Sequence, residues 1–157
     1  YHHCRSKDDL IRETVAHVFA QKTAPMVELL EGAGTSSQRL AAFVNFFVRL
    51  LVEDSVFFRL LVRELVDGDG ARLKALVDSV LERPFRLVSS LADPQRPKDE
   101  QFLAAVSIIG LILGHMQLSA LLPYLPGGRP EHADPSVVAS HITTVLRRAF
   151  HDGAREK

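Results

Sequence analysis

Side chains with chemical reactivity are few in this sequence, and several of them stand together at its start. His2, His3 and Cys4 are adjacent, and imidazole and thiolate groups are zinc ligands. Adjacent residues rarely close a metal site by themselves, and no fourth ligand follows nearby in the sequence. The metal interpretation is therefore the weaker one, and we predict no bound metal.

The other candidate catalytic residues are isolated from one another. His17, His115 and His141 stand singly on predicted helices, where histidine more often makes a structural hydrogen bond than acts as a base. The chain contains no nucleophile motif, no phosphate-binding loop and no carboxylate pair set in an apolar helix. Glu64, beside Arg63, is typical of an ion pair or a ligand contact. We therefore predict that the protein is not an enzyme and needs no cofactor.

Composition narrows the class of protein. The chain has 157 residues, 46% of them apolar and 24% charged, as is ordinary for one soluble domain with a sizeable core. Lys plus Arg and Asp plus Glu both number 19, so the chain has no net attraction for nucleic acid or anionic membranes. The lone Cys4 cannot form an internal disulfide, and no signal peptide is visible. We predict a cytoplasmic protein, and we expect further residues before Tyr1.

Apolar residues recur three and four positions apart through most of the chain, and strand-like alternation is absent. This pattern predicts an all-α fold, a bundle of about six helices. Proline should kink the first helix at Pro25 and bend the fourth at Pro84. The predicted helices run from Lys7 to Leu30, from Ser36 or Ser37 to about Leu51, from Ser55 to Asp67, from about Ala71 to Leu91, from Pro97 to about Pro123, and from Pro135 towards Gly153.

The fifth predicted helix is apolar on every side. No Asp, Glu, Lys or Arg occurs from Gln101 to Gly128, and such a helix must be covered all round. Its small-residue side, with Gly110 and Gly114, favours close approach of a helix from a second copy of the chain. Together with the last helix, this side would form a four-helix bundle across a two-fold axis. The predicted dimer interface comprises Ser107, Gly110, Gly114, Leu118, Leu121, Val138, Ile142, Val145 and Ala149.

A membrane-associated helix bundle is the main alternative for this helix. About 20 apolar residues suffice to cross a bilayer, and two glycines four positions apart are typical of packed membrane helices. His115, Gln117 and Ser119 weigh against that interpretation, because they are polar and lie in the middle or late part of the stretch. No basic cluster or aromatic belt flanks it either. We therefore favour a soluble dimer without membrane contact.

Aromatic residues on different predicted helices indicate a ligand pocket. Phe47, Phe57, Phe58, Phe85 and Phe102 could line it, because two proline-bent helices pack imperfectly and leave space. Methionine adapts to varied ligands, and an amide offers a polar contact. The predicted effector-binding residues are Phe47, Phe57, Leu61, Glu64, Phe85, Val88, Ile109, Leu113, Met116 and Gln117. The alternative is a solid core, as expected of a helical scaffold or interaction domain without a ligand.

A short motif at the start of the chain resembles a known family. Tyr1, His3, Ser6, Lys7 and Leu10 form the pattern Tyr-x-His-x-x-Ser-Lys-x-x-Leu. It is similar to the end of the DNA-binding headpiece in the tetracycline-repressor (TetR) family, where it closes the recognition helix and opens the next one. Cys4 departs from the pattern, since the family usually has Phe there, and His2 stands where an aromatic residue is frequent. Arg63-Glu64-Leu65, within Ser55–Asp67, also resembles members of that family.

The resemblance implies a transcriptional regulator, expected to be a repressor. Residues 1–6 would end a helix-turn-helix headpiece whose greater part precedes Tyr1, and residues 7–157 would bind an effector and dimerise. The family's phosphate contacts carry over to Tyr1, His3 and Lys7, and a helix N-terminus with a lysine does attract phosphate. The implied partners are a second copy of the chain, operator DNA and a small, partly apolar effector.

Overall fold

The computed structural model describes residues 6–151, and in this part of the chain every regular element is helical. Helices α4 and α5 continue one another through the π-helical turn η1, so the described residues form six helical rods, as the apolar spacing predicts. The α-helices are α1 (Lys7–Glu31), α2 (Ser36–Glu53), α3 (Ser55–Asp67), α4 (Gly70–Leu76), α5 (Glu82–Ser89), α6 (Lys98–Leu118) and α7 (Pro135–Phe150). The shorter elements are η1 (Val77–Leu81) and the 3₁₀ turns η2 (Ser119–Tyr124) and η3 (Pro130–Ala133).

Side chains that accept backbone N–H groups set the helix starts. Ser6 accepts the Asp9 N–H at 3.1 Å before α1, as the sequence predicts. Helices α2 and α3 begin at Ser36 and Ser55, as predicted, but the serines that the sequence offers as their caps do not cap them: Thr35 caps α2, and Asp54 caps α3. Thr35 wins because Gln38 completes a reciprocal capping box with it. Acidic and hydroxyl caps are nearly equivalent in sequence, so their neighbours decide the boundary.

The two prolines have different effects. Pro25 lies inside α1, which nevertheless continues to Glu31. Pro84 has no N–H to donate to the Val80 carbonyl, and the turn just before it is π-helical rather than α-helical. In that turn the Glu82 N–H donates to the Val77 carbonyl. The π turn thus shifts the hydrogen-bond register and lets the α4–η1–α5 rod run past the proline.

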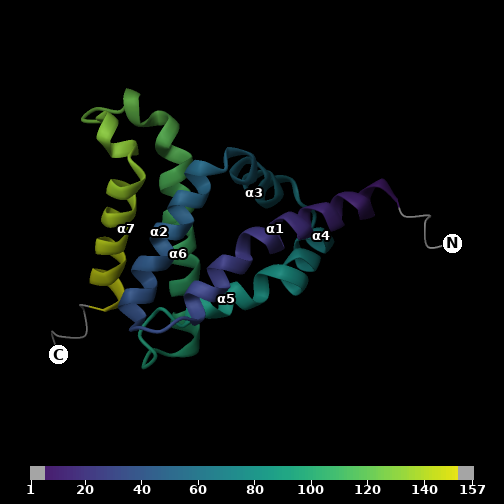
Figure 1. Ribbon diagram of the computed structural model, residues 1–157, viewed down its shortest axis with the longest axis horizontal. Coiled ribbons are helices and arrows are strands. Elements are labelled where there is room, and N and C mark those ends of the chain that lie inside the picture. Colours follow the sequence, from purple (N-terminus) through teal and green to yellow (C-terminus); the bar gives the residue numbers. More distant parts are fainter. Residues whose placement is uncertain (1–5, 152–157) are drawn as a thin grey trace.

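The helices form two groups joined by the long diagonal helix α1 (Figure 1). Helices α2, α6 and α7 stand side by side at one end, and α2 lies against both α1 and α7. The α4–η1–α5 rod runs along one side of α1, while α3 lies on its other side. One continuous apolar core links the groups, and its largest fully buried side chains include Phe19, Phe43, Leu40, Leu91, Ile108, Ile112 and Ile142. The predicted interface residue Ile142 therefore belongs to the core of this chain.

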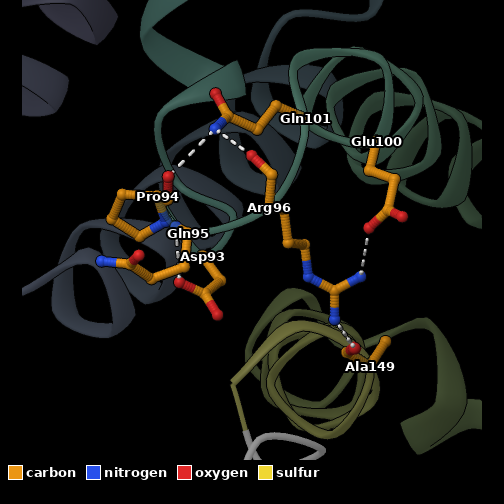
Figure 2. A network of polar contacts seen from close by, with 7 residues as sticks. All are labelled: Asp93, Pro94, Gln95, Arg96, Glu100, Gln101 and Ala149. Atoms are coloured by element: carbon orange, nitrogen blue, oxygen red, sulfur yellow. Dashed lines mark hydrogen bonds and ion pairs between the residues drawn. The ribbon is translucent and has the colours of Figure 1, made fainter.

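A polar network fixes the loop before α6 to the end of α7 (Figure 2). The Arg96 guanidinium donates to the Ala149 carbonyl at 3.2 Å and lies over the Phe150 ring, 5.7 Å from its centroid. It also lies 3.6 Å from the Glu100 carboxylate. Gln101 closes the loop from the other side, because its amide donates to the Arg96 carbonyl at 2.9 Å. This network sets the direction in which α6 leaves the loop.

Helix α6 has one buried and one exposed face. Ala104, Ala105, Ile108, Ile112 and Met116 are buried in the core. On the small-residue side, a Cβ on Gly110 or on Gly114 would meet no atom of another described segment within 4 Å. No other described helix therefore covers that side. The segment Lys98–Tyr124 is also apolar and long enough to cross a bilayer, and only 22% of its most apolar 18-residue stretch is buried.

Candidate ligand-binding cavity

An apolar cavity of about 170 Å³ lies where α1, α2, α3, the η1–α5 rod and α6 meet. Aromatic and aliphatic side chains from all of these elements line it. The lining residues are Phe19, Thr23, Met26, Phe43, Phe47, Leu50, Phe57, Leu61, Leu65, Leu81, Pro84, Phe85, Val88, Ile109 and Leu113.

The cavity offers almost no hydrogen-bonding groups. Thr23 carries the one polar side chain of the lining, and its hydroxyl donates back to the Ala20 carbonyl at 3.4 Å. An apolar cavity of about 150 Å³ stays dry in proteins and can hold a molecule such as benzene. The space in this chain is therefore suited to a short alkyl chain or one aromatic ring.

Aromatic contacts hold the walls in place. Phe19 of α1 meets Phe57 of α3 edge to face at 5.3 Å between ring centroids, and Phe43 stacks with Phe47 at 5.8 Å. Phe85 of α5 contacts Phe102 of α6 at 5.5 Å, but Phe102 is more than half exposed and lies outside the lining. The walls are therefore built by several helices rather than by one flexible loop.

The predicted effector residues do not all line one cavity. Phe47, Phe57, Leu61, Phe85, Val88, Ile109 and Leu113 line the apolar cavity. Glu64 lines a second cavity, described below, while Met116 and Gln117 lie elsewhere and Phe58 faces a surface hollow beside Gln117. Met116 is buried under a hollow at the α6–α7 seam and Gln117 is exposed, because α6 has passed beyond the cavity at that point.

Phe19, Thr23, Met26 and Phe43 also line the cavity, although sequence reasoning did not place them there. A signal for the first three exists, since positions 19, 23 and 26 fall on one face of α1. That spacing marks an inward face but does not distinguish a cavity wall from a filled core. Phe43 carries the same ambiguity on α2.

The second cavity, of about 250 Å³, lies between α1, α3 and the α4–η1 segment. Glu64 is 2% exposed and forms an ion pair, one of the two roles that the sequence indicates, but its partner is Arg72 and not the adjacent Arg63. The pair is incomplete, because Glu64 Oε2 and Arg72 Nε are buried without a hydrogen-bond partner among the described residues. The other lining residues are Arg12, Glu13, Val15, Ala16, Ala75, Leu76 and Ser79.

A histidine pair lies at the seam between α6 and α7. The His115 and His141 ring centroids are 5.6 Å apart, and both rings line a hollow of about 360 Å³ that His132 also borders. Burial lowers the pKa of His115 below its ordinary value, and the neighbouring His141 lowers it further. The described residues contain no group of three or more His, Cys, Asp or Glu side chains placed to hold a metal ion.

The predicted dimer residues lie mostly on the outer surface of α6 and α7. Ser107, Gly110, Leu118, Leu121, Val145 and Ala149 are exposed, Gly114 and Val138 are half-buried, and Ile142 is fully buried. The prediction for Ile142 is wrong, because α7 turns Ala139, Ile142, Thr143 and Leu146 towards the core. Of the predicted α7 residues, only Val145 and Ala149 are exposed. Around these positions the exposed apolar side chains continue with Phe102, Leu103, Val106, Tyr124, Leu125 and Val137.

The predicted phosphate contacts are only partly visible. Tyr1 and His3 lie outside the described residues. Lys7 is the first residue of α1 and is exposed, next to a surface hollow that Leu10 and Leu60 also line. Lys7 is thus exposed at the start of α1, which projects from the rest of the fold (Figure 1).

Comparison of the chain with protein-family models, with curated proteins and with solved structures finds no match. The family resemblance therefore rests on the residues of the motif, and the function rests on the geometry of the cavities and surfaces.

Proposed function

We propose that this chain is the effector-binding and dimerisation domain of a transcriptional regulator of the tetracycline-repressor type. The observation that carries the proposal is the apolar cavity lined by five parts of the fold, one of which is α1. That helix starts at Ser6 and Lys7, within the motif that resembles the end of the headpiece. One helix thus joins the ligand cavity to the segment expected to meet DNA.

The mechanism follows from this shared helix. A ligand in the cavity touches Phe19, Thr23 and Met26 on α1 and favours whichever position of α1 fits it best. Because α1 leads towards the headpiece, each position of α1 sets a different spacing of two headpieces in a dimer. The ligand shifts the equilibrium only to the extent that its affinity differs between the two spacings.

The exposed face of α6 and the outer edge of α7 supply the dimer interface in this proposal. Apolar side chains such as Leu118, Leu121 and Val145 are exposed there, and a patch of this kind marks an interaction site in a soluble protein. Gly110 and Gly114 leave room for the backbone of a second helix. Ile142 has no part in this interface, since it is buried in its own chain.

A membrane-associated bundle is the second candidate, and the exposed apolar length of α6 favours it. The two candidates differ in what covers α6, namely a second copy of the chain or lipid. A protein that stays in aqueous solution as a dimer after mild extraction without detergent supports the first. One that pellets with membranes and needs detergent supports the second.

DNA binding tests the regulator class. The protein is produced from the complete reading frame that contains residues 1–157, and duplexes are selected from a random library at low salt. We expect sequence-specific binding that weakens uniformly when Lys7 is changed to Ala, with a salt slope lower by about one, because one phosphate contact is lost. Glu28→Ala, at an exposed position on the same helix, is the matched surface control. A preceding segment without a basic helix-turn-helix, or strong specific binding by residues 1–157 alone, contradicts the proposal.

A further inference from the structure

Two histidines at the seam between α6 and α7 have no hydrogen-bond partner among the described residues. The ring centroids of His115 and His141 lie 5.6 Å apart, and the two ring planes are inclined by 66°. His115 is half-buried on α6, while His141 is exposed on α7. The hollow that both rings border shares no lining residue with the apolar cavity. The pair is thus a cluster of uncommitted imidazoles that the proposed ligand cavity does not use.

His132 borders the same hollow, but its ring is already committed. Its Nδ1 accepts the backbone N–H of Arg129 at 3.1 Å. A neutral imidazole that accepts at one nitrogen carries its proton on the other, so Nε2 of His132 is a donor. A metal ion needs a nitrogen with a free lone pair, and His132 does not offer one. His115 and His141 have no such hydrogen bond, so each can turn a lone pair towards a metal.

The distance between the two rings matches the distance between imidazoles that share a metal ion. Zinc binds imidazole nitrogen at about 2.0–2.1 Å, so two imidazoles on one tetrahedral ion have ring centroids about 5 Å apart. The observed separation of 5.6 Å is slightly larger. His141 is exposed, and a small rotation of its side chain brings the two rings to that distance without moving α6 or α7.

We propose that His115 and His141 together bind one late first-row transition-metal ion, such as Zn²⁺. Imidazole suits zinc, copper and nickel, whereas magnesium and calcium prefer oxygen ligands. Structural zinc sites usually have four protein ligands, so this site leaves coordination positions for water in the hollow. The sequence does not show the pair, because the two histidines stand singly on different helices.

A metal in this position would link α6 to α7. The two helices also supply the dimer surface of the proposed regulator, but the metal site needs neither a dimer nor a ligand in the apolar cavity. Because the two histidines are close together only in the folded chain, the ion binds the folded state better and stabilises it. The expected consequence is a fold whose stability depends on the concentration of free zinc.

The test must exclude the other candidate ligands, His2, His3 and Cys4, which are adjacent in the sequence. The full chain is therefore compared with a background variant in which all three are changed to Ser. Zn²⁺, Cu²⁺, Ni²⁺ and Mg²⁺ are titrated into the background variant by calorimetry. We expect one zinc ion per chain, and a melting temperature about 5–10 °C higher at a hundred times the dissociation constant. Mg²⁺ should have no effect.

Single substitutions in the same background assign the site. His141→Gln, at an exposed position, should keep the fold and lower the affinity for Zn²⁺ at least about tenfold, because even the loss of a group that only orients a ligand costs that much. His115→Gln should have the same effect. His132→Gln, beside the same hollow, and His17→Gln, exposed on α1, are the matched controls and should leave the affinity unchanged.

Several results would overturn the two-histidine site. They are zinc binding that disappears in the background variant, equal affinities in His141→Gln and its parent, and a loss of affinity in His132→Gln as large as that in His141→Gln. If His115→Gln does not fold, the comparison of His141→Gln with His132→Gln decides. Binding of butylbenzene in the apolar cavity is independent of all these results, so the proposed function stands or falls separately.

Discussion

His115 of α6 and His141 of α7 face one another across the helix seam, with their ring centroids 5.6 Å apart. The residues that line the hollow beside this seam include no Asp or Glu. No carboxylate of this lining can therefore stabilise a proton on the His115 ring, and the imidazoles of His141 and His132 border the same hollow. This arrangement makes the seam sensitive to pH.

Acidification should destabilise the fold through His115. Burial and His141 hold the His115 pKa below its ordinary value of 6.5, so the unfolded chain takes up the proton first. The contribution of His115 to the free energy of unfolding is fully present above about pH 6.5. It is lost progressively as the pH falls from there through the lower pKa that His115 has in the folded protein. Urea unfolding between pH 8 and 5, at one protein concentration, should show this fall. The fall in the free energy of unfolding should be smaller in His115→Gln and should be unchanged in the exposed control His17→Gln. Equal pH dependence in the natural chain and both variants would contradict the assignment of this fall to His115.

Arg72→Ala should lower the free energy of unfolding by about 2–3 kcal/mol, because it leaves the buried Glu64 carboxylate without its ion-pair partner. Arg63→Ala, at an exposed position next to Glu64, should change it by no more than about 0.5 kcal/mol. Urea denaturation of both variants gives the comparison. Similar losses in the two variants would mean that the Glu64–Arg72 pair contributes no specific stability.

Gly114→Leu should separate a dimer from a monomer. A Cβ at this position would meet no other part of the described chain within 4 Å, so a monomer should tolerate the substitution and even gain about 1 kcal/mol in helix propensity. In a dimer built on this face, the same leucine pushes the helices apart and costs about 1–3 kcal/mol. Light scattering at micromolar concentration should therefore show a natural dimer and a weakened variant. A natural chain that is monomeric there would refute the interface.

The spacing of apolar residues is sufficient to predict the helices, but not the residues that cap them or the side of each helix that is buried. Positions such as Leu40, Phe43 and Leu51 repeat at helical spacing and are buried as that spacing predicts. The caps at Thr35 and Asp54 depended on side-chain partners that several neighbouring residues could also have provided. The π turn before Pro84 could not be predicted from composition, because a proline can bend a helix, break it or shift its register.

The cavity could be predicted only in part, for a related reason. Phe57, Phe85 and Leu113 were identified because they are apolar and come from different helices. Met116 and Gln117 are predicted to line the same pocket as Leu113, three and four positions earlier, yet the cavity closes before α6 reaches them. The crossing points of helices are set by long-range packing, which a single sequence does not display. The same limit explains why Ile142 was expected at a surface and lies in the core.

Binding of an apolar molecule in the cavity is the central claim, and the melting temperature measures it most directly. Butylbenzene at about a hundred times its dissociation constant should raise the melting temperature of the natural chain by about 5–10 °C, because only the folded state binds it. Leu113→Phe fills part of the cavity and should abolish the rise while the helical content is kept; Leu118→Phe, on the exposed face of the same helix, should preserve it. A natural chain whose melting temperature does not move, or an equal rise in Leu113→Phe, would contradict the claim.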